Sequence, residues 1–242
     1  MVEHACLVGG VIVVEECLQC SGLLLFRAMC KRRASSSDAR VLLLSISREK
    51  RGHATIAGNS NVCHVHVAAS TLGRMEEAKT EIGRILSAYK VGSERTVVAL
   101  DSTLCSLLLN LDHGSSSSVD RIIRYIVHLS REYCAVMLLV QRELFPSPGA
   151  RRKLEYVADS WLSLSASPQQ LPSCRSRLKK PGAKPQFKTE TFQVELPELE
   201  LWSRRVEVEK GKEKETRTVA AASFNLELKE REREAKHRLT LP

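Results

Sequence analysis

Aromatic residues are scarce in this sequence, and long apolar runs and an excess of acidic residues are missing from it. Phe, Trp and Tyr together make up 5% of its 242 residues. The apolar runs fall well short of the ~20 residues that a membrane-spanning helix needs, so we expect no membrane segment. Basic residues outnumber acidic ones by 37 to 28, which gives a formal charge of +9. This charge favours anionic partners without naming one.

The sequence also gives no indication of disulfide bonds, of secretion or of a metal site. The eight cysteines are scattered through apolar segments, and no cleavable leader precedes them, so we expect reduced thiols in an intracellular protein. Cys17 and Cys20 form half of a zinc ribbon, but no second pair follows at zinc-site spacing, which favours two core thiols. His64 and His66 alternate on one face of a predicted strand without a third ligand nearby. The sequence therefore predicts no metal.

The apolar runs predict an α/β fold. Short runs of the length of buried strands alternate with segments of helical periodicity, which is typical of βαβ units and a parallel sheet with helices on both faces. Loops are predicted at residues 35–38, 114–118 and 145–149. The predicted strands are residues 10–14, 40–46, 62–67, 96–100, 135–140 and 156–164, and the predicted helices are 18–30, 72–89, 104–111 and 119–133.

The composition changes near Leu171 and divides the chain into three parts. Residues 1–168 read as one folded domain, residues 169–222 as a basic, Pro-containing and largely disordered linker, and residues 223–242 as a separate C-terminal segment. The linker suits a solvated connection or an arm that contacts RNA phosphates, because several cations can displace counterions from nucleic acid. The six candidate RNA contacts are Arg175, Arg177, Lys179, Lys180, Lys184 and Lys188.

The segment after the first strand has the position of a phosphate-binding loop but not its chemistry. Such a loop needs glycines whose amides converge on phosphates and a lysine for the terminal phosphates. Here Glu15 and Glu16 lie where phosphates would sit, and leucines follow Gly22 in place of the lysine and hydroxyl residue. The loop is degenerate, and ATP hydrolysis is not expected. A serine hydrolase is not indicated, since no GxSxG elbow is present.

Asp101 follows an apolar strand in the manner of a Walker B carboxylate, which would hold magnesium. Without the lysine loop, we favour a simpler role. An Asp-Ser pair at a strand end commonly caps the following helix by accepting its free amides.

The last residues combine a charged middle with apolar ends. Glu and basic residues four apart stabilise a helix by only about 0.2–0.5 kcal/mol per pair, so this helix is marginal alone. An apolar–charged–apolar segment of this kind is typical of a docking element that folds on a partner. The predicted docking residues are Phe224, Leu226, Leu228, Leu239 and Leu241.

Two segments resemble the Elongator complex protein 5 family. The tail SFNLELKEREREAKHRLTLP at 223–242 is similar to the conserved tail of that family, and TVVALDSTLCSLLLNL at 96–111 is similar to its strand-Asp-Ser-helix segment. The degenerate phosphate loop that begins at Gly9 and Gly10 also resembles this family. Residues between 168 and 218 match the family poorly, and the family usually continues beyond this C-terminus into an acidic segment.

The resemblance implies a RecA-like domain that has lost its nucleotide motifs and acts as a scaffold, with no catalytic residues, cofactor or metal. It implies a hetero-hexameric ring with the fourth and sixth Elongator subunits, contact with the remaining subunits, and tRNA bound through the assembly during wobble-uridine modification. It places the protein in the cytoplasm and the nucleus. Two other functions stay open from the residues alone: an active RecA-type NTPase, and a stand-alone RNA-binding protein that uses the basic linker.

Overall fold

The computed structural model describes residues 9–36, 39–47, 61–68, 73–89, 95–111, 116–166, 172–179, 184–195 and 199–205. The chain divides into two units, Met1–Arg205 and Val206–Pro242, and every described residue lies in the first. The predicted docking segment 223–242 lies outside the described residues, as do residues 206–222 of the predicted linker. Within the described part, none of the helices is long and apolar enough to cross a membrane.

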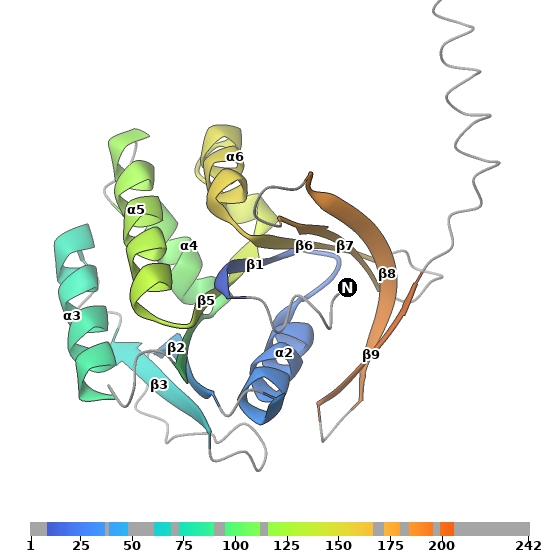
Figure 1. Ribbon diagram of the computed structural model, residues 1–242. Coiled ribbons are helices and arrows are strands. Elements are labelled where there is room, and N and C mark those ends of the chain that lie inside the picture. Colours follow the sequence, from blue (N-terminus) through green and yellow to red (C-terminus); the bar gives the residue numbers. More distant parts are fainter. Residues whose placement is uncertain are drawn as a thin grey trace, which may run out of the picture. The chain divides into compact units, whose positions relative to one another are not determined.

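The strands of the described residues form a nine-stranded sheet with the order β3-β2-β4-β5-β1-β6-β7-β8-β9 (Figure 1). Six strands, from β3 across to β6, are parallel, which confirms the predicted parallel sheet. The strands are β1 (Gly10–Glu16), β2 (Arg40–Ser47), β3 (Val62–Ala68), β4 (Thr96–Leu100), β5 (Ala135–Gln141), β6 (Ser160–Ser165), β7 (Ser173–Leu178), β8 (Gln186–Glu195) and β9 (Glu200–Arg205).

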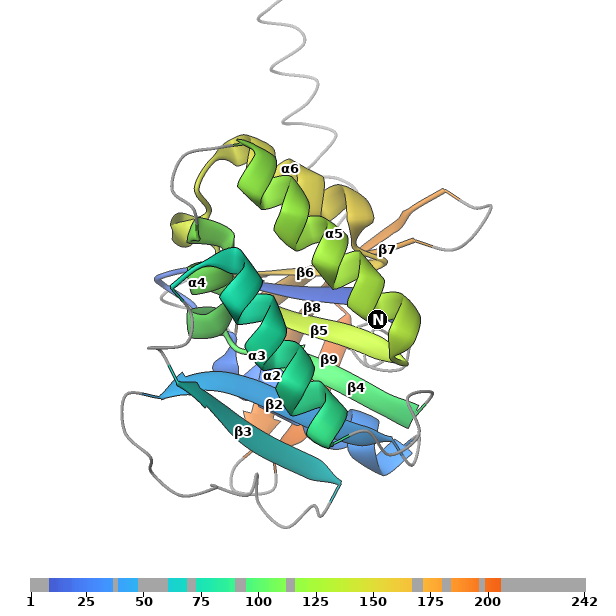
Figure 2. The same cartoon turned by 90° about the vertical axis from the view of Figure 1, so that its left-hand side faces the viewer.

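Helices cover both faces of the sheet and enclose two separate cores. Helix α2 (Leu23–Ser36) packs on one face, where Phe26 and Met29 are fully buried. The other face is covered by α3 (Met75–Ala88), α4 (Ser102–Asn110), α5 (Ser116–Glu132) and α6 (Pro148–Val157), as Figure 2 shows. A short 3-10 helix, η3 (Arg142–Leu144), follows β5.

The predicted linker is wrong wherever the structure describes it. Residues 173–205 contain three antiparallel strands that extend the sheet beyond β6, so the folded domain does not end at residue 168. Strands β7 and β8 each bury one face only. Cys174 and Leu178 of β7, and Phe192 of β8, pack into the same core as α2, while the residues between them are polar. A half-buried strand with charged outward residues has the composition of a linker, which is why the prediction failed.

Helix α6 is absent from the predictions because its start reads as a turn. Ser147 caps the helix by accepting a hydrogen bond from the Ala150 amide (3.1 Å), and Pro148 occupies the first turn, where its missing N–H costs nothing. The strand predicted from residue 156 accordingly begins only at Ser160. The predicted helix at 18–30 begins at Leu23, because residues 17–20 form a turn.

Candidate functional site

The junction of β1 and α2 is closed on itself. Glu15 and Glu16 belong to strand β1 and not to a loop, which corrects their predicted position. The Cys17 amide donates to the Cys20 carbonyl (3.2 Å), and the Cys20 amide donates back (2.9 Å). This tight turn uses amides that an open phosphate loop would direct at its ligand. Leu18 lies at its tip, 77% exposed.

Glu16 places a carboxylate at the start of α2. Its Oε2 accepts a hydrogen bond from the Gly22 amide (2.8 Å) and a longer one from the Ser21 hydroxyl (3.4 Å), and the side chain is buried. The N-terminus of a helix attracts anions through its free amides and its dipole. In this protein the anion is the chain's own carboxylate, in the place where a nucleotide-binding fold holds phosphate.

Gly22 serves close packing of helix on sheet. A Cβ at this position would lie 3.0 Å from Cδ1 of Leu139 and of Leu164, and 3.3 Å from Cβ of Glu16. The glycine that suggested a phosphate loop therefore lets α2 approach β5 and β6.

Asp101 caps α4, as the sequence favoured. Its Oδ1 accepts a hydrogen bond from the Leu104 amide (2.8 Å). Burial raises the pKa of Asp101 from 3.8 to about 6. The amides of Leu104 and Thr103 and the charge of Arg27 act in the opposite direction, while the charge of Glu16 raises the pKa further. Asp101 is thus influenced by the Glu16 carboxylate and by the Arg27 guanidinium at the closed junction.

Glu15 points to the opposite face of the sheet and is fully buried there. It pairs with Arg151 of α6 (Nε to Oε1, 2.5 Å) and with Arg142 of η3 (3.3 Å), and it accepts a hydrogen bond from the Ser163 hydroxyl (2.5 Å). Burial acts to raise the pKa of Glu15, but the hydrogen bonds from Arg151 and Ser163 and the charges of both arginines outweigh it and hold the pKa below 4.5. The Trp161 indole donates to the same Ser163 hydroxyl (3.0 Å). This network fixes α6 and η3 on the sheet.

The cysteines and histidines that were weighed as metal ligands, and not predicted to be such, lie apart from a third ligand among the described residues. Cys17 and Cys20 are free thiols, and Cys20 is buried. Ser45 Oγ lies 2.6 Å from His64 Nε2 and 2.9 Å from His66 Nδ1. Across the described residues, His, Cys, Asp and Glu nowhere gather in threes that could hold a metal ion.

Of the six predicted RNA contacts, five are described and Lys180 is not. Arg175 and Arg177 lie on the α6 face of the sheet, and Lys188 lies on the opposite face. Arg177 forms an ion pair with Glu155 of α6 (3.2 Å) and donates to the Glu155 carbonyl. Lys179 donates to the Tyr156 carbonyl, also at the end of α6. Lys184, Lys188 and Arg175 are exposed.

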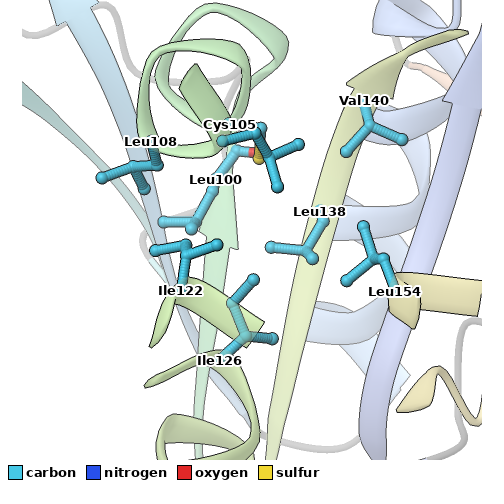
Figure 3. A pocket seen from close by; sticks show the side chains of 9 residues that line it. Leu100, Cys105, Leu108, Ile122, Ile126, Leu138, Val140 and Leu154 are labelled. Atoms are coloured by element: carbon cyan, nitrogen blue, oxygen red, sulfur yellow. The ribbon is translucent and has the colours of Figure 1, made fainter. Parts of the chain in front are cut away.

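One apolar cavity lies between the sheet and helices α4, α5 and α6 (Figure 3). Its space of about 10 Å³ is at the lower limit for a single water molecule, and a site without polar groups does not attract one. It is a packing gap and not a ligand site. The lining residues are Leu100, Cys105, Leu108, Leu109, Ile122, Ile126, Leu138, Val140 and Leu154.

The fold and the closed junction define a class: a RecA-like α/β protein in which the amide of Gly22, at the start of α2, binds the chain's own Glu16 carboxylate. The fold matches the crystal structure of flagellar accessory protein FlaH from Methanocaldococcus jannaschii with a TM-score of 0.55, at 13% identity, over 81% of this chain and 89% of that chain. The family model for Elongator subunit Iki1 matches residues 9–206, and the chain belongs to this family, that of Elongator complex protein 5. None of the curated proteins matches it.

A poor match to the family was expected between residues 168 and 218, but the family model extends through this stretch to residue 206 and ends before the tail at 223–242. Arg142, Arg151 and Tyr156 were not among the predicted site residues. A Glu in the middle of an apolar strand was the available signal for the arginines, because a buried carboxylate needs a partner. Tyr156 gave no signal, since it comes near the basic residues only through folding.

Proposed function

We propose that this Elongator subunit is a non-catalytic scaffold, which assembles a RecA-like ring with the fourth and sixth subunits and thereby supports modification of the tRNA wobble uridine. It works in the cytoplasm and the nucleus, it needs no cofactor, and tRNA is bound by the assembly. The tail residues Phe224, Leu226, Leu228, Leu239 and Leu241 dock on a partner.

The observation that supports a non-catalytic role is the hydrogen bond from the Gly22 amide to Glu16 Oε2 (2.8 Å). A phosphate at this helix end would meet a buried carboxylate of the same charge, without a lysine to offset it. The tight turn at Cys17–Cys20 adds to the barrier, because opening it would break two backbone hydrogen bonds.

An active NTPase is disfavoured by the same geometry. It would need Glu16 to leave α2 and Asp101 to leave its cap on α4. Calorimetric titration of the full chain with ATP and Mg²⁺ tests this, and we expect no binding. Saturable binding at micromolar ATP would contradict the scaffold role.

A stand-alone RNA-binding protein with a flexible basic arm is also disfavoured. The arm was inferred from residues 174–188, and Arg177 and Lys179 of that stretch are held by the end of α6. Cations that already have partners release fewer counterions from nucleic acid than free ones.

The experiment that tests the scaffold role is co-expression of this chain with the fourth and sixth Elongator subunits, followed by native mass spectrometry. We expect one stable species that contains all three. If the other two subunits associate while this chain stays alone, the ring assignment is wrong.

A further inference from the structure

The turn between β1 and α2 holds two thiols opposite each other. Cys17 and Cys20 form an isolated antiparallel bridge, in which each amide donates to the carbonyl of the other (3.2 and 2.9 Å). Both are free thiols. Residues that exchange both hydrogen bonds in an antiparallel pair have Cα atoms about 5.5 Å apart, and their side chains leave the backbone on the same side. The turn therefore brings the two cysteines together.

This spacing suits a disulfide. Cysteines that are joined by one have Cα atoms about 4.4–6.8 Å apart. Their Cβ atoms lie about 3.5–4.5 Å apart, whereas the Cβ atoms of a directly opposed pair lie about 4.5–5.5 Å apart. A bond between Cys17 and Cys20 therefore needs a small closing movement of the turn. A disulfide under such strain is easily reduced again, which is typical of a reversible modification and not of a permanent link.

The two thiols differ in their access to solvent. Cys17 is half-buried and Cys20 is 6% exposed, while Leu18 and Gln19 at the tip of the turn are exposed. Burial raises the pKa of the Cys20 thiol, and the charges of Cys17 and Glu16 raise it further. Because the thiolate and not the thiol attacks a disulfide, Cys17 is placed to react first with a reagent from solvent.

The turn is held from two sides. The Leu18 amide donates to Oε1 of Glu143 in η3 (3.3 Å). On the other side, Glu16 accepts a hydrogen bond from the Gly22 amide at the start of α2 (2.8 Å). The folded chain has therefore already ordered the backbone between the two thiols, which an unfolded chain would have to order when the disulfide forms.

We propose that Cys17 and Cys20 are a modification site, a dithiol that a low-molecular-weight disulfide such as oxidised glutathione converts to an intramolecular disulfide. The Cys17 thiolate attacks one sulfur of the reagent, which breaks the S–S bond of the reagent, forms a mixed disulfide and releases one glutathione. Cys20 then gives its proton to solvent and attacks Cys17 Sγ, which releases the second glutathione. The two cysteines lose two electrons and two protons, and the reagent gains them.

The first step favours the second. A mixed disulfide carries no charge at Cys17, so it removes one of the charges that raise the pKa of Cys20. The product closes the β1–α2 junction by a covalent bond in addition to the two backbone hydrogen bonds of the turn. The proposal is independent of the scaffold role, because both cysteines and the groups that hold the turn belong to this chain.

Mass spectrometry of the full chain, equilibrated with oxidised and reduced glutathione and then alkylated, tests the proposal. Cleavage after Glu16 and after Arg27 releases residues 17–27, which contain Cys17 and Cys20 and no other cysteine. We expect this peptide to have lost two hydrogen atoms. At the same glutathione ratio, the ratio of disulfide to dithiol should be about 10-fold higher in the native chain than in urea, because the folded turn is already ordered. Equal ratios, or two alkylated thiols in oxidised glutathione alone, would overturn the proposal.

Single-cysteine variants test the order of the two steps. Cys20→Ala keeps a small apolar side chain in the core, and the reaction should stop at a glutathione adduct on Cys17. Cys17→Ser should leave Cys20 reduced in the folded chain, because this thiol is buried. Adducts of equal abundance in the two variants would show that the turn does not distinguish the thiols, and the proposed order would be wrong. Thermal unfolding under reducing conditions is the folding control.

Two other cysteines serve as internal controls. Cys63 is half-buried like Cys17, but its partner in the sheet is Leu42, so it should carry at most a glutathione adduct. Cys105 is 4% exposed and should stay reduced. A disulfide that involves Cys63 or Cys105 at the same glutathione ratio would show that oxidation is not selective for the turn, and would contradict a defined site.

Discussion

Glu15 and Glu16 are neighbours in the chain, yet they stabilise opposite faces of the sheet. Because side chains alternate along a strand, Glu15 meets Arg151 and Arg142 on the α6 face, and Glu16 meets the start of α2 on the other. Both carboxylates are buried at the end of β1, where desolvation is costly unless each finds partners.

Replacement of Glu15 should show how much the pair with Arg151 contributes. Glu15→Gln should lower the free energy of unfolding at pH 7 by about 1–3 kcal/mol, because it leaves two arginines without their carboxylate. The folded-state pKa of Glu15 lies below 4.5, so its contribution is present above about pH 4.5 and is lost as the pH falls through the folded-state pKa. Urea unfolding at pH 7 and in acid checks this. A difference between the two proteins that stays constant with pH would contradict it.

Asp101 should show the opposite dependence on pH. Its pKa is raised from 3.8 to about 6, so between these values the folded state holds a proton that the unfolded state releases, and stability falls as the pH rises. This rise in the pKa of Asp101 corresponds to a loss of about 3 kcal/mol of unfolding free energy at pH 7. Asn keeps the cap for the Leu104 amide without the charge.

Asp101→Asn should therefore match the unmodified chain near pH 4 and exceed it in unfolding free energy at pH 7. Urea unfolding at the two pH values measures the difference. A variant that is less stable at pH 7 than at pH 4, relative to the unmodified chain, would show that the charge of Asp101 stabilises the junction.

Gly10 is required where β1 begins. Its φ of +82° is in the left-handed region, and a Cβ would lie 2.1 Å from Oδ2 of Asp159, which accepts a hydrogen bond from the Val11 amide (2.8 Å). Gly10→Ala should cost about 2–4 kcal/mol of unfolding free energy through strain and the displaced Asp159. Gly83 of α3 is the control. A Cβ there has open space, so Gly83→Ala should gain about 0.5–1 kcal/mol. Thermal unfolding that ranks the two variants in reverse would contradict this account.

At the scale of elements, predictability follows burial. The central parallel strands β1, β4 and β5, buried on both faces, appear as nearly continuous apolar runs, and β4 matches its prediction at both ends. Strand β7 is buried on one face and carries Arg175 and Arg177 on the other, and its antiparallel pairing with β6 and β8 supplies order that no local pattern indicates.

The candidate site was predictable to the same extent. The missing loop lysine is visible in the sequence, and so is the capping role of Asp101. The hydrogen bond of Glu16 to the start of α2 could not be predicted. It depends on the face to which Glu16 points and on the closed turn at Cys17–Cys20. The pairing of Glu15 with Arg142 and Arg151 joins residues more than 120 positions apart.

The packing of the end of α6 on strand β7 should depend on Arg177. Its side chain is 16% exposed and binds both the carboxylate and the carbonyl of Glu155. Arg177→Met should cost about 1–3 kcal/mol, because Glu155 and the helix end lose a charged donor. Lys153→Met breaks an exposed pair with Asp120 and should change stability by less than about 0.5 kcal/mol. Chemical denaturation compares the two, and equal costs would mean that Arg177 does not connect α6 to β7.

At the scale of the whole molecule, the surfaces differ in chemistry. The junction of β1 and α2 is closed by Glu16 and the turn at Cys17–Cys20, while Tyr156 at the end of α6 and Phe187 of β8 are exposed. If the subunit acts as a scaffold, we expect its partners to bind surfaces outside this junction. The apolar residues of the tail are the strongest candidates from sequence, because they flank a charged segment in the manner of a docking element.

Removal of residues 224–242 should therefore weaken assembly with the fourth and sixth subunits while the Tm of the isolated chain changes little. Native mass spectrometry of the co-expressed subunits gives the first quantity and calorimetry the second. A matched pair of full-length variants refines the result: Phe224→Ser with Leu226→Ser and Leu228→Ser should reproduce the loss of assembly, whereas Glu230→Gln with Glu232→Gln and Glu234→Gln should not. If the deletion lowers the Tm markedly while the three subunits still assemble, the tail belongs to the fold of this chain, and the docking role is wrong.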